Sequence, residues 1–220
     1  SKMLIFPQTN PTMRTLACTL PILLLLTACQ DMEAPGGKGY ADIPAFAPQG
    51  INVVVEIPAG TNRKIEYDKA TRQFRPDQRG GKDRVIDFLP YPGNYGFIPS
   101  THAPESQGGD GDPLDVLLLS AALPTGTVVA ARPIGALQLL DEGQMDTKII
   151  AVPADSSLQT MQPADFADFS IQYDGAKHIL ETWFLYYDGL GTNTYEGWAD
   201  EAKAMELVRK WATSAEPSTE

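Results

Sequence analysis

Cysteine and histidine are scarce in this sequence, and clusters of positive charge are absent. The 220 residues include two cysteines and two histidines, and no more than two lysines or arginines follow one another. Both cysteines, Cys18 and Cys29, lie near the N-terminus, so the rest of the chain has no disulfide and depends on its hydrophobic core for stability. His102 and His178 have no partner at metal-ligand spacing, which argues against a histidine-bound metal.

The charge balance is strongly acidic. The chain carries 28 acidic and 17 basic residues, which gives a net charge of −11 at neutral pH. Such a chain repels nucleic acid and anionic lipid, so we expect no nucleic-acid partner. An anionic ligand would have to be held by individual lysines and arginines or by bound metal ions. The hydrophobic content of 43% is ordinary for a folded domain.

One apolar stretch stands out, close to the N-terminus. From Met13 the sequence has one arginine, a short apolar segment and then small residues, which is the order found in a secretory signal peptide. The segment is too short to span a bilayer. It ends in Leu-Thr-Ala-Cys at positions 26–29, which resembles the bacterial lipobox. An uncleaved anchor or a chance match is the alternative interpretation.

The lipobox resemblance implies cleavage before Cys29 and attachment of a lipid to its sulfur. We therefore predict a signal peptide over residues 1–28, with translation starting at Met13, and a flexible tether over residues 29–48. The partner of this region is then a bacterial membrane, reached through the lipid anchor. Gln30, rather than an aspartate, follows the cysteine, and this favours the outer membrane with the domain facing the periplasm.

Three carboxylates gather in the run Asp110-Gly111-Asp112-Pro113-Leu114-Asp115, directly before an apolar segment at 116–119. Ionised carboxylates this close repel one another unless a cation lies between them. Hard divalent cations such as Mg2+ prefer carboxylate oxygens, so the run predicts a metal site. Glycine at 111 permits a backbone conformation that other residues avoid. A solvated acidic turn is the alternative, but it gives no reason for a carboxylate beside an apolar strand.

Other charged residues lie where the sequence predicts burial. Glu56 sits inside the β-branched segment 51–57, where an unpaired charge is costly. Lys64 and Glu66 are two positions apart, so they share one face of an extended strand. Asp141 and Asp146 lie in a turn segment that leads to Lys148, at the start of another apolar stretch.

Local patterns predict strands first and helices last. β-branched or alternating segments predict strands at 51–57, 63–68, 71–77, 116–119, 127–140 and 148–152. Apolar residues at helical spacing predict helices over 176–187 and 199–211. This order indicates an α+β domain with a closed or nearly closed sheet, over residues 49–212, followed by a tail at 213–220.

These segments together resemble the family I soluble inorganic pyrophosphatases. The family signature Asp-x-Asp-Pro-hydrophobic-Asp-hydrophobic matches residues 110–116 throughout, and further matches occur in order at 55–59, 64–69, 83–84, 91–99, 132–135, 141–148, 151–153 and 196–198. The resemblance implies a closed or nearly closed five-stranded antiparallel β-barrel, OB-like, with two C-terminal helices packed outside. It also implies hydrolysis of inorganic pyrophosphate to two phosphates by a metal-activated water.

The resemblance implies a role for each matching residue. It places the metal ions on Asp110, Asp115, Asp146, Asp141 and Glu56, with Asp115 bridging two of them. Asp112 becomes the general base or orients the attacking water. Pyrophosphate is bound by Lys64, Glu66, Arg84, Tyr95, Lys148 and Tyr186, of which Lys64, Arg84 and Tyr95 also take part in catalysis. The cofactor implied is Mg2+, several ions per site, with Mn2+ or Zn2+ as substitutes and Ca2+ as an inhibitor.

One segment departs from the family pattern. The family usually has a stretch like Phe-x-x-Tyr-Lys at the end of a helix, where this chain has Phe-Leu-Tyr-Tyr-Asp at 184–188. With Tyr186 as the tyrosine of that stretch, Tyr187 occupies the lysine position and one phosphate-binding cation is missing. This arrangement predicts weaker substrate binding rather than loss of activity.

Two other functions stay open at this point. A degenerate family member that only binds pyrophosphate, polyphosphate or divalent metal is supported by the missing lysine, although a pure binder has no need of Asp112. An interaction lipoprotein with a solvated acidic face does not account for Glu56 inside an apolar strand. Family members often form homo-oligomers, but one sequence does not define an interface, so the oligomeric state stays open.

Overall fold

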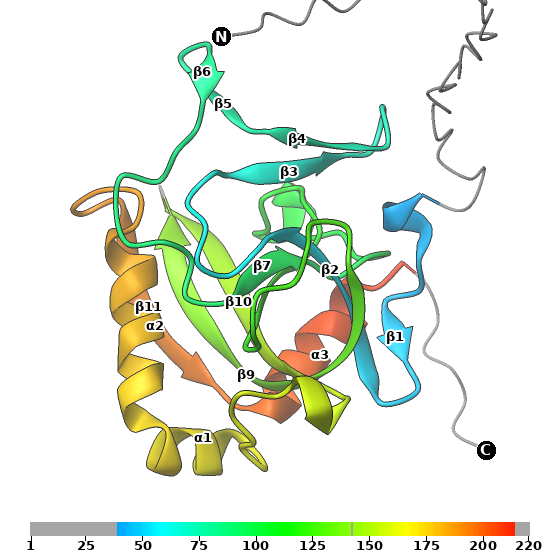
Figure 1. Cartoon of the computed structure of the whole chain (residues 1–220), viewed down its shortest axis with the longest axis vertical. Coiled ribbons are helices and arrows are strands. Elements are labelled where there is room, and N and C mark those ends of the chain that lie inside the picture. The colour runs from blue at the N-terminus through cyan, green and yellow to red at the C-terminus, as the bar shows by residue number, and fades with distance from the viewer. Residues whose placement is uncertain (1–38, 142, 214–220) are drawn as a thin grey trace, which may run out of the picture. The chain divides into compact units, whose positions relative to one another are not determined.

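Five strands form a ring at the centre of the fold (Figure 1). The computed structural model describes residues 39–141 and 143–213. In ring order the strands are β2 (Gly50–Ile57), β7 (Asn94–Phe97), β8 (Asp115–Leu118), β10 (Gln144–Pro153) and β9 (Val128–Asp141). β9 also pairs with β2, which closes the ring and confirms the closed sheet predicted from the sequence. β1 (Phe46–Ala47) and β11 (Asn193–Ala199) add to its edges.

The expectation that the sheet is antiparallel throughout is wrong at one pair. β8 and β10 run parallel, with Asp115 beside Lys148, while the other four pairs of the ring are antiparallel. The reason is topological, because strands that alternate in direction around a closed ring must be even in number. A closed ring of five strands therefore contains at least one parallel pair.

Two hairpins and three α-helices surround the ring. The hairpins are β3 (Ile65–Asp68) with β4 (Gln73–Pro76) and β5 (Gln78–Arg79) with β6 (Lys82–Asp83), and neither joins the main sheet. The helices are α1 (Phe166–Gln172), α2 (Asp174–Tyr186) and α3 (Glu201–Trp211). Short 3-10 helices occur at Tyr40–Asp42, Glu105–Gln107 and Ser156–Leu158.

The sequence patterns missed one α-helix and five strands, of which β1, β5 and β6 have only two residues each. Two helices were expected, but α1 is a third; it has seven residues, too few for a clear helical period. β7 and β11 were not predicted, since the first contains Asn94 and Gly96 and the second is largely polar. Gly96 is required here because a Cβ at this position would lie 1.9 Å from the carbonyl oxygen of Val54 in the neighbouring strand.

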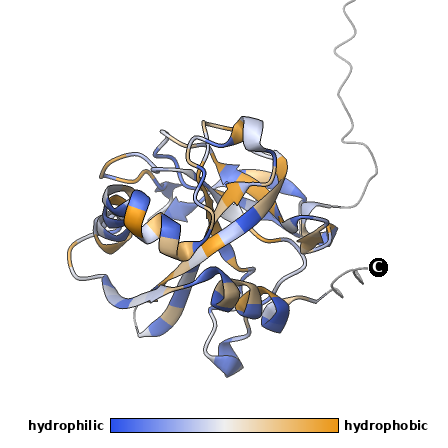
Figure 2. Ribbon diagram, turned by 90° about the horizontal axis from the view of Figure 1, so that it is seen from below, coloured by the Kyte–Doolittle hydropathy of each residue, from blue (hydrophilic) through white to orange (hydrophobic). Residues whose placement is uncertain are grey.

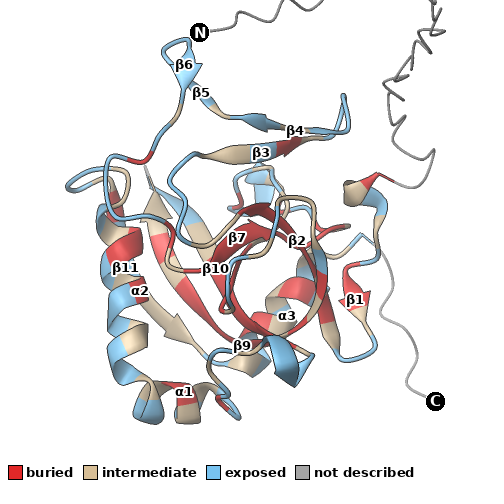
Figure 3. Cartoon of the chain, in the orientation of Figure 1, coloured by how far each residue is buried: buried red, intermediate tan, exposed pale blue. Residues whose placement is uncertain are grey.

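The ring strands are buried on both faces (Figure 3). Alternate residues of β8 and β10 enter two different core clusters: Val116 and Ile149 pack in the cluster that includes α3, and Leu117 and Ile150 in the one that includes α1 and α2. Burial on both faces explains why these strands read as unbroken apolar runs. Figure 2 shows apolar residues along the central strands, while the helices alternate apolar and polar residues.

No helix within the described residues is long and apolar enough to cross a membrane. The predicted signal peptide, Cys29 and the first half of the predicted tether, residues 29–38, lie outside the residues that the structure describes.

Candidate active site

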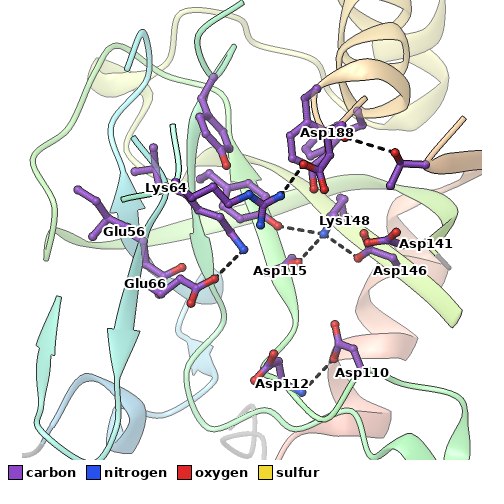
Figure 4. A pocket seen from close by; sticks show the side chains of 18 of the residues that line it. Glu56, Lys64, Glu66, Asp110, Asp112, Asp115, Asp141, Asp146, Lys148 and Asp188 are labelled. Carbon is purple, nitrogen blue, oxygen red and sulfur yellow. Dashed lines mark hydrogen bonds and ion pairs between the residues drawn. The ribbon is translucent and has the colours of Figure 1, made fainter. Parts of the chain in front are cut away.

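A cavity of about 380 Å³ is lined by residues from β2, β3, β5, β7, β8, β9 and β10, from α2 and from the loops next to them (Figure 4). Eight carboxyl groups and four cationic groups line it, so the carboxyl groups outnumber the cationic groups by four. They are Glu56, Glu66, Asp110, Asp112, Asp115, Asp141, Asp146 and Asp188, and Lys64, Arg79, Arg84 and Lys148. The cavity brings together every metal- and phosphate-binding residue predicted from the sequence except Tyr186.

Three carboxylates in this cavity are placed to hold a metal ion. Asp110, Asp115 and Asp146 each offer one oxygen, and these oxygens all lie within 4.8 Å of one another. Asp110 is exposed and the other two are half-buried. A set of three carboxylate oxygens, open on one side, suits a hard divalent cation that keeps part of its water shell.

Strand pairing explains how distant parts of the sequence meet here. The parallel pair β8–β10 sets Lys148 opposite Asp115. Asp146 lies two positions before Lys148 in β10, so both side chains leave the same face of the strand. Asp141 ends β9 at the turn into β10, and its buried Oδ1 has no hydrogen-bond partner among the described residues. An unpartnered carboxylate oxygen of this kind is available to a cation.

Lys148 is the central cation of the cavity. Its Nζ donates to Asp115 Oδ2 at 2.5 Å, Asp146 Oδ1 at 2.6 Å and the Tyr95 hydroxyl at 3.0 Å, and the residue is 4% exposed (Figure 4). Burial alone would lower the pKa of Lys148, but the charges of Asp115 and Asp146 raise it well above its usual value. The lysine therefore stays charged, and it compensates two carboxylates that lie within reach of a metal ion.

The acidic turn before β8 is held by its backbone. Gly111 has a φ of 87°, the left-handed conformation expected of a glycine at this position. The Asp112 amide donates to Asp110 Oδ1 at 2.9 Å, and the Leu114 amide donates to the Thr101 hydroxyl at 2.9 Å. Burial, followed by the charges of Asp110 and Asp115, raises the pKa of Asp112. A carboxylate with a raised pKa is a better proton acceptor, as a general base requires.

Glu56 reaches the cavity through an irregularity in β2. The pairing of β2 with β7 shifts register between Val55 and Ile57, so Glu56 leaves the regular alternation of the strand. Its Oε1 accepts a hydrogen bond of 2.7 Å from the Tyr67 amide, and the residue is 8% exposed. Burial raises the pKa of Glu56 to about 8, and nearby Asp115 adds to the effect. A carboxyl group in this position ionises readily only when a cation joins it.

Glu56→Gln is therefore expected to stabilise the metal-free protein at high pH. The folded pKa of about 8 exceeds the unfolded value of 4.5, so the wild type loses stability as pH rises through this interval. Glutamine keeps the acceptor for the Tyr67 amide and removes the charge. We expect a gain of about 4–5 kcal/mol at pH 9 and almost none at pH 4. Urea unfolding in chelator measures it.

The exposed Glu206, which pairs with Lys203 on the surface of α3, provides a matched control for this experiment. Glu206→Gln is expected to change stability equally little at both pH values. A Glu56→Gln gain that is the same at pH 4 and pH 9 would contradict the burial of a neutral carboxyl group.

The cationic side of the cavity is built from two loops that face each other. Lys64 Nζ lies 2.6 Å from Glu66 and 3.6 Å from Asp77, as its position two residues from Glu66 predicted. Arg84 donates through Nη1 to Asp77 at 3.2 Å and lies 2.8 Å from Asp188 through Nη2. The buried Nε of Arg84 has no hydrogen-bond partner among the described residues. Arg84 thus retains donors for an anion even while it is held by two carboxylates.

The prediction for Tyr186 is not supported by its position. Tyr186 is 43% exposed and lies outside the main cavity, whereas Tyr187 lines it. The Tyr187 ring stacks on Trp183, with 4.8 Å between ring centroids and 12° between planes. If the tyrosine that faces the cavity is the one in the family stretch, then Asp188, not Tyr187, stands at the lysine position.

Sequence reasoning also missed Arg79 and Asp188. Asp188 accepts hydrogen bonds from both terminal nitrogens of Arg79, at 2.8 and 2.9 Å. The two residues are 109 positions apart, and no local pattern links them.

The comparisons with known proteins agree with this site. The family model for inorganic pyrophosphatase matches residues 53–216. The chain is 37% identical to an inorganic pyrophosphatase of Saccharolobus solfataricus over 169 residues, 74% of this chain and 91% of that protein. It is 39% identical to one from Neisseria meningitidis serogroup A over 165 residues, 73% and 85% of the two chains. The crystal structure of inorganic pyrophosphatase from Thermus thermophilus superposes with a TM-score of 0.64 at 34% identity, covering 78% and 95% of the two chains.

Proposed function

This chain belongs to the inorganic pyrophosphatase family, and from that membership we propose that it hydrolyses pyrophosphate with Mg2+ held by its aspartates, as an exported and lipid-anchored enzyme. The relatives are hydrolases of inorganic pyrophosphate, and the chain shares that enzyme class. We propose three things beyond this enzyme class: that the bound metal is Mg2+, that the individual residues have the roles given below, and that the protein is exported and lipid-anchored.

One observation carries the proposal for the metal. Asp110, Asp115 and Asp146 place three oxygens within 4.8 Å in a cavity with four more carboxyl groups than cations. Pyrophosphate is itself a compact polyanion and would be repelled by this cavity. Bound Mg2+ would neutralise both partners and lower the pKa of a water molecule. The all-oxygen donor set fits Mg2+ better than a softer metal.

The residues of the chain then have distinct tasks. Asp112, with its raised pKa, accepts the proton of the attacking water. Lys64 and Arg84 bind the phosphate oxygens from one side, and Lys148 and Tyr95 bind them from the side of β10 and β7. Phosphoryl transfer asks mainly for positioning and charge stabilisation, which these fixed donors supply.

The first test is phosphate release from pyrophosphate by the purified chain, with Mg2+ and with chelator. We expect turnover with Mg2+ and its loss on chelation, and a further loss in Asp115→Asn at every Mg2+ concentration. Asp174→Asn, at the exposed start of α2, is the control and is expected to behave as the wild type. Absence of turnover, with pyrophosphate still bound, would favour the degenerate binding protein instead.

The export proposal is supported by the sequence of residues 13–29. We propose that Cys29 carries the lipid and that the domain faces the periplasm from the outer membrane. In a bacterial host, the wild-type chain is expected in the membrane fraction and Cys29→Ser in the soluble fraction. Cys18→Ser is the control, since Cys18 lies within the predicted signal peptide. Wild-type protein in the cytoplasmic fraction would contradict the proposal.

A further inference from the structure

Asp188 lies at the junction of two cationic side chains of the cavity (Figure 4). Its carboxylate accepts two hydrogen bonds from Arg79 and lies 2.8 Å from Nη2 of Arg84. The side chains of Asp188 and Arg84 are 13% and 12% exposed, so this contact is largely shielded from water. An arginine binds a carboxylate through two parallel N–H donors in one plane, and it binds a phosphate with the same geometry.

The position of Asp188 is unfavourable for its own helix. It follows Tyr187, the residue that caps the C-terminus of α2, where the helix dipole disfavours negative charge. The two arginines more than offset this effect and the cost of burial, because the pKa of Asp188 is lowered. The carboxylate is therefore ionised and occupies the anion-binding donors of the cavity.

Arg79 is the more exposed of the two arginines. Its side chain is 61% exposed and projects from the short hairpin β5–β6, which does not join the main sheet. Arg79 lines both the main cavity and an adjoining outer pocket, together with Arg84, Tyr187 and Asp188. Released from Asp188, its guanidinium group has access to an anion in the main cavity.

We propose that Asp188 competes internally with substrate and product for Arg84 and Arg79, and that Arg79 is a further substrate-binding residue. This inference rests on the proposed function, since it concerns the affinity of the same cavity. Metal-bound pyrophosphate displaces the carboxylate from the arginines. Inorganic phosphate, with less charge and fewer oxygens, competes less well, so the return of Asp188 favours product release.

The test compares the full wild-type chain with Asp188→Asn, Asp188→Glu and Asp83→Asn. Asp83 pairs with Arg63 at 2.7 Å in the same region and does not line the main cavity, so it controls for net charge. We expect Asp188→Asn to lower KM for pyrophosphate by about five-fold and to tighten inhibition by inorganic phosphate by a similar factor. Asp188→Glu, which keeps the carboxylate, is expected to stay close to the wild type.

Arg79→Gln separates the two parts of the proposal. In the Asp188→Asn background it is expected to remove most of the gain in affinity. In the wild type it is expected to raise KM by a smaller factor, because substrate must there displace Asp188 before it reaches Arg79. An unchanged or raised KM in Asp188→Asn would overturn the proposal and show that Asp188 positions Arg84 instead.

Calorimetric titration of inorganic phosphate in the presence of Mg2+ gives a readout that does not depend on turnover. Tighter phosphate binding by Asp188→Asn than by the wild type and Asp83→Asn supports the competition even if the chain proves to be a binding protein. Equal binding by all three overturns it. Absence of turnover in the wild type would contradict the proposed function but not the competition between Asp188 and phosphate.

Discussion

Asp112→Asn is expected to lower kcat for pyrophosphate by about 10³-fold, within the range lost when a general base is removed. Asparagine has nearly the same shape as aspartate but cannot accept the proton of the attacking water. The amide of residue 112 still donates to Asp110, so the turn before β8 is expected to keep its form. KM and the Mg2+ requirement should therefore change little. Steady-state phosphate release measured over a range of Mg2+ concentrations checks both.

A second variant distinguishes proton transfer from metal binding. Asp110→Asn removes one of the three oxygens of the metal group, so its activity is expected to recover when Mg2+ is raised. Asp112→Asn is expected to stay slow at saturating Mg2+. Recovery of Asp112→Asn at high Mg2+ would assign Asp112 to metal binding and contradict its role as general base.

The metal group could be predicted because its chemistry is local. Asp110, Asp112 and Asp115 stand within six residues of sequence, and a cation between them accounts for three carboxylates before a buried strand better than a solvated turn does. Their meeting with Asp146 and Lys148 depends on the parallel pair β8–β10, which strand patterns alone do not define. The prediction that Asp146 and Lys148 join the acidic run therefore came from the family resemblance.

The orientation of the end of α2 was derivable but was missed. Leu180, Trp183, Phe184 and Tyr187 follow one another at intervals of three, one and three, which places Tyr187 on the buried face of the helix. Tyr186 falls on the opposite, exposed side. Helical spacing therefore selects Tyr187, and the family stretch Phe-x-x-Tyr-Lys gives the same residue when its phenylalanine is set on Phe184.

The pairing of Asp188 with Arg79 could not be predicted. It joins the end of α2 to a two-residue strand that has no hydrophobic pattern, and each partner alone resembles a solvated surface charge. Only the three-dimensional arrangement shows that Asp188 is shielded and that it meets a second arginine.

Lys148→Met is expected to cause the largest loss of stability of the substitutions considered. Methionine fills most of the same volume but leaves Asp115 and Asp146 without their shared cation. Lys148 is only 4% exposed, so water does little to replace that cation. Breaking a buried ion pair on one side costs roughly 3–5 kcal/mol. We expect a loss of this size in chelator, measured by urea unfolding, and a fall of about 10²- to 10³-fold in kcat/KM. Lys203→Met, which breaks an exposed pair on α3, is expected to cost well under 1 kcal/mol.

Mg2+ separates the two roles of Lys148. In the metal-free protein the lysine neutralises Asp115 and Asp146, and a divalent cation held by these carboxylates would supply the same neutralisation. Mg2+ is therefore expected to stabilise Lys148→Met more than the wild type and to recover much of the lost unfolding free energy. Turnover should not recover with it, because the cation that we propose to bind substrate beside Tyr95 is still missing. Equal stabilisation of both proteins by Mg2+ would show that the lysine and the metal do not share these carboxylates.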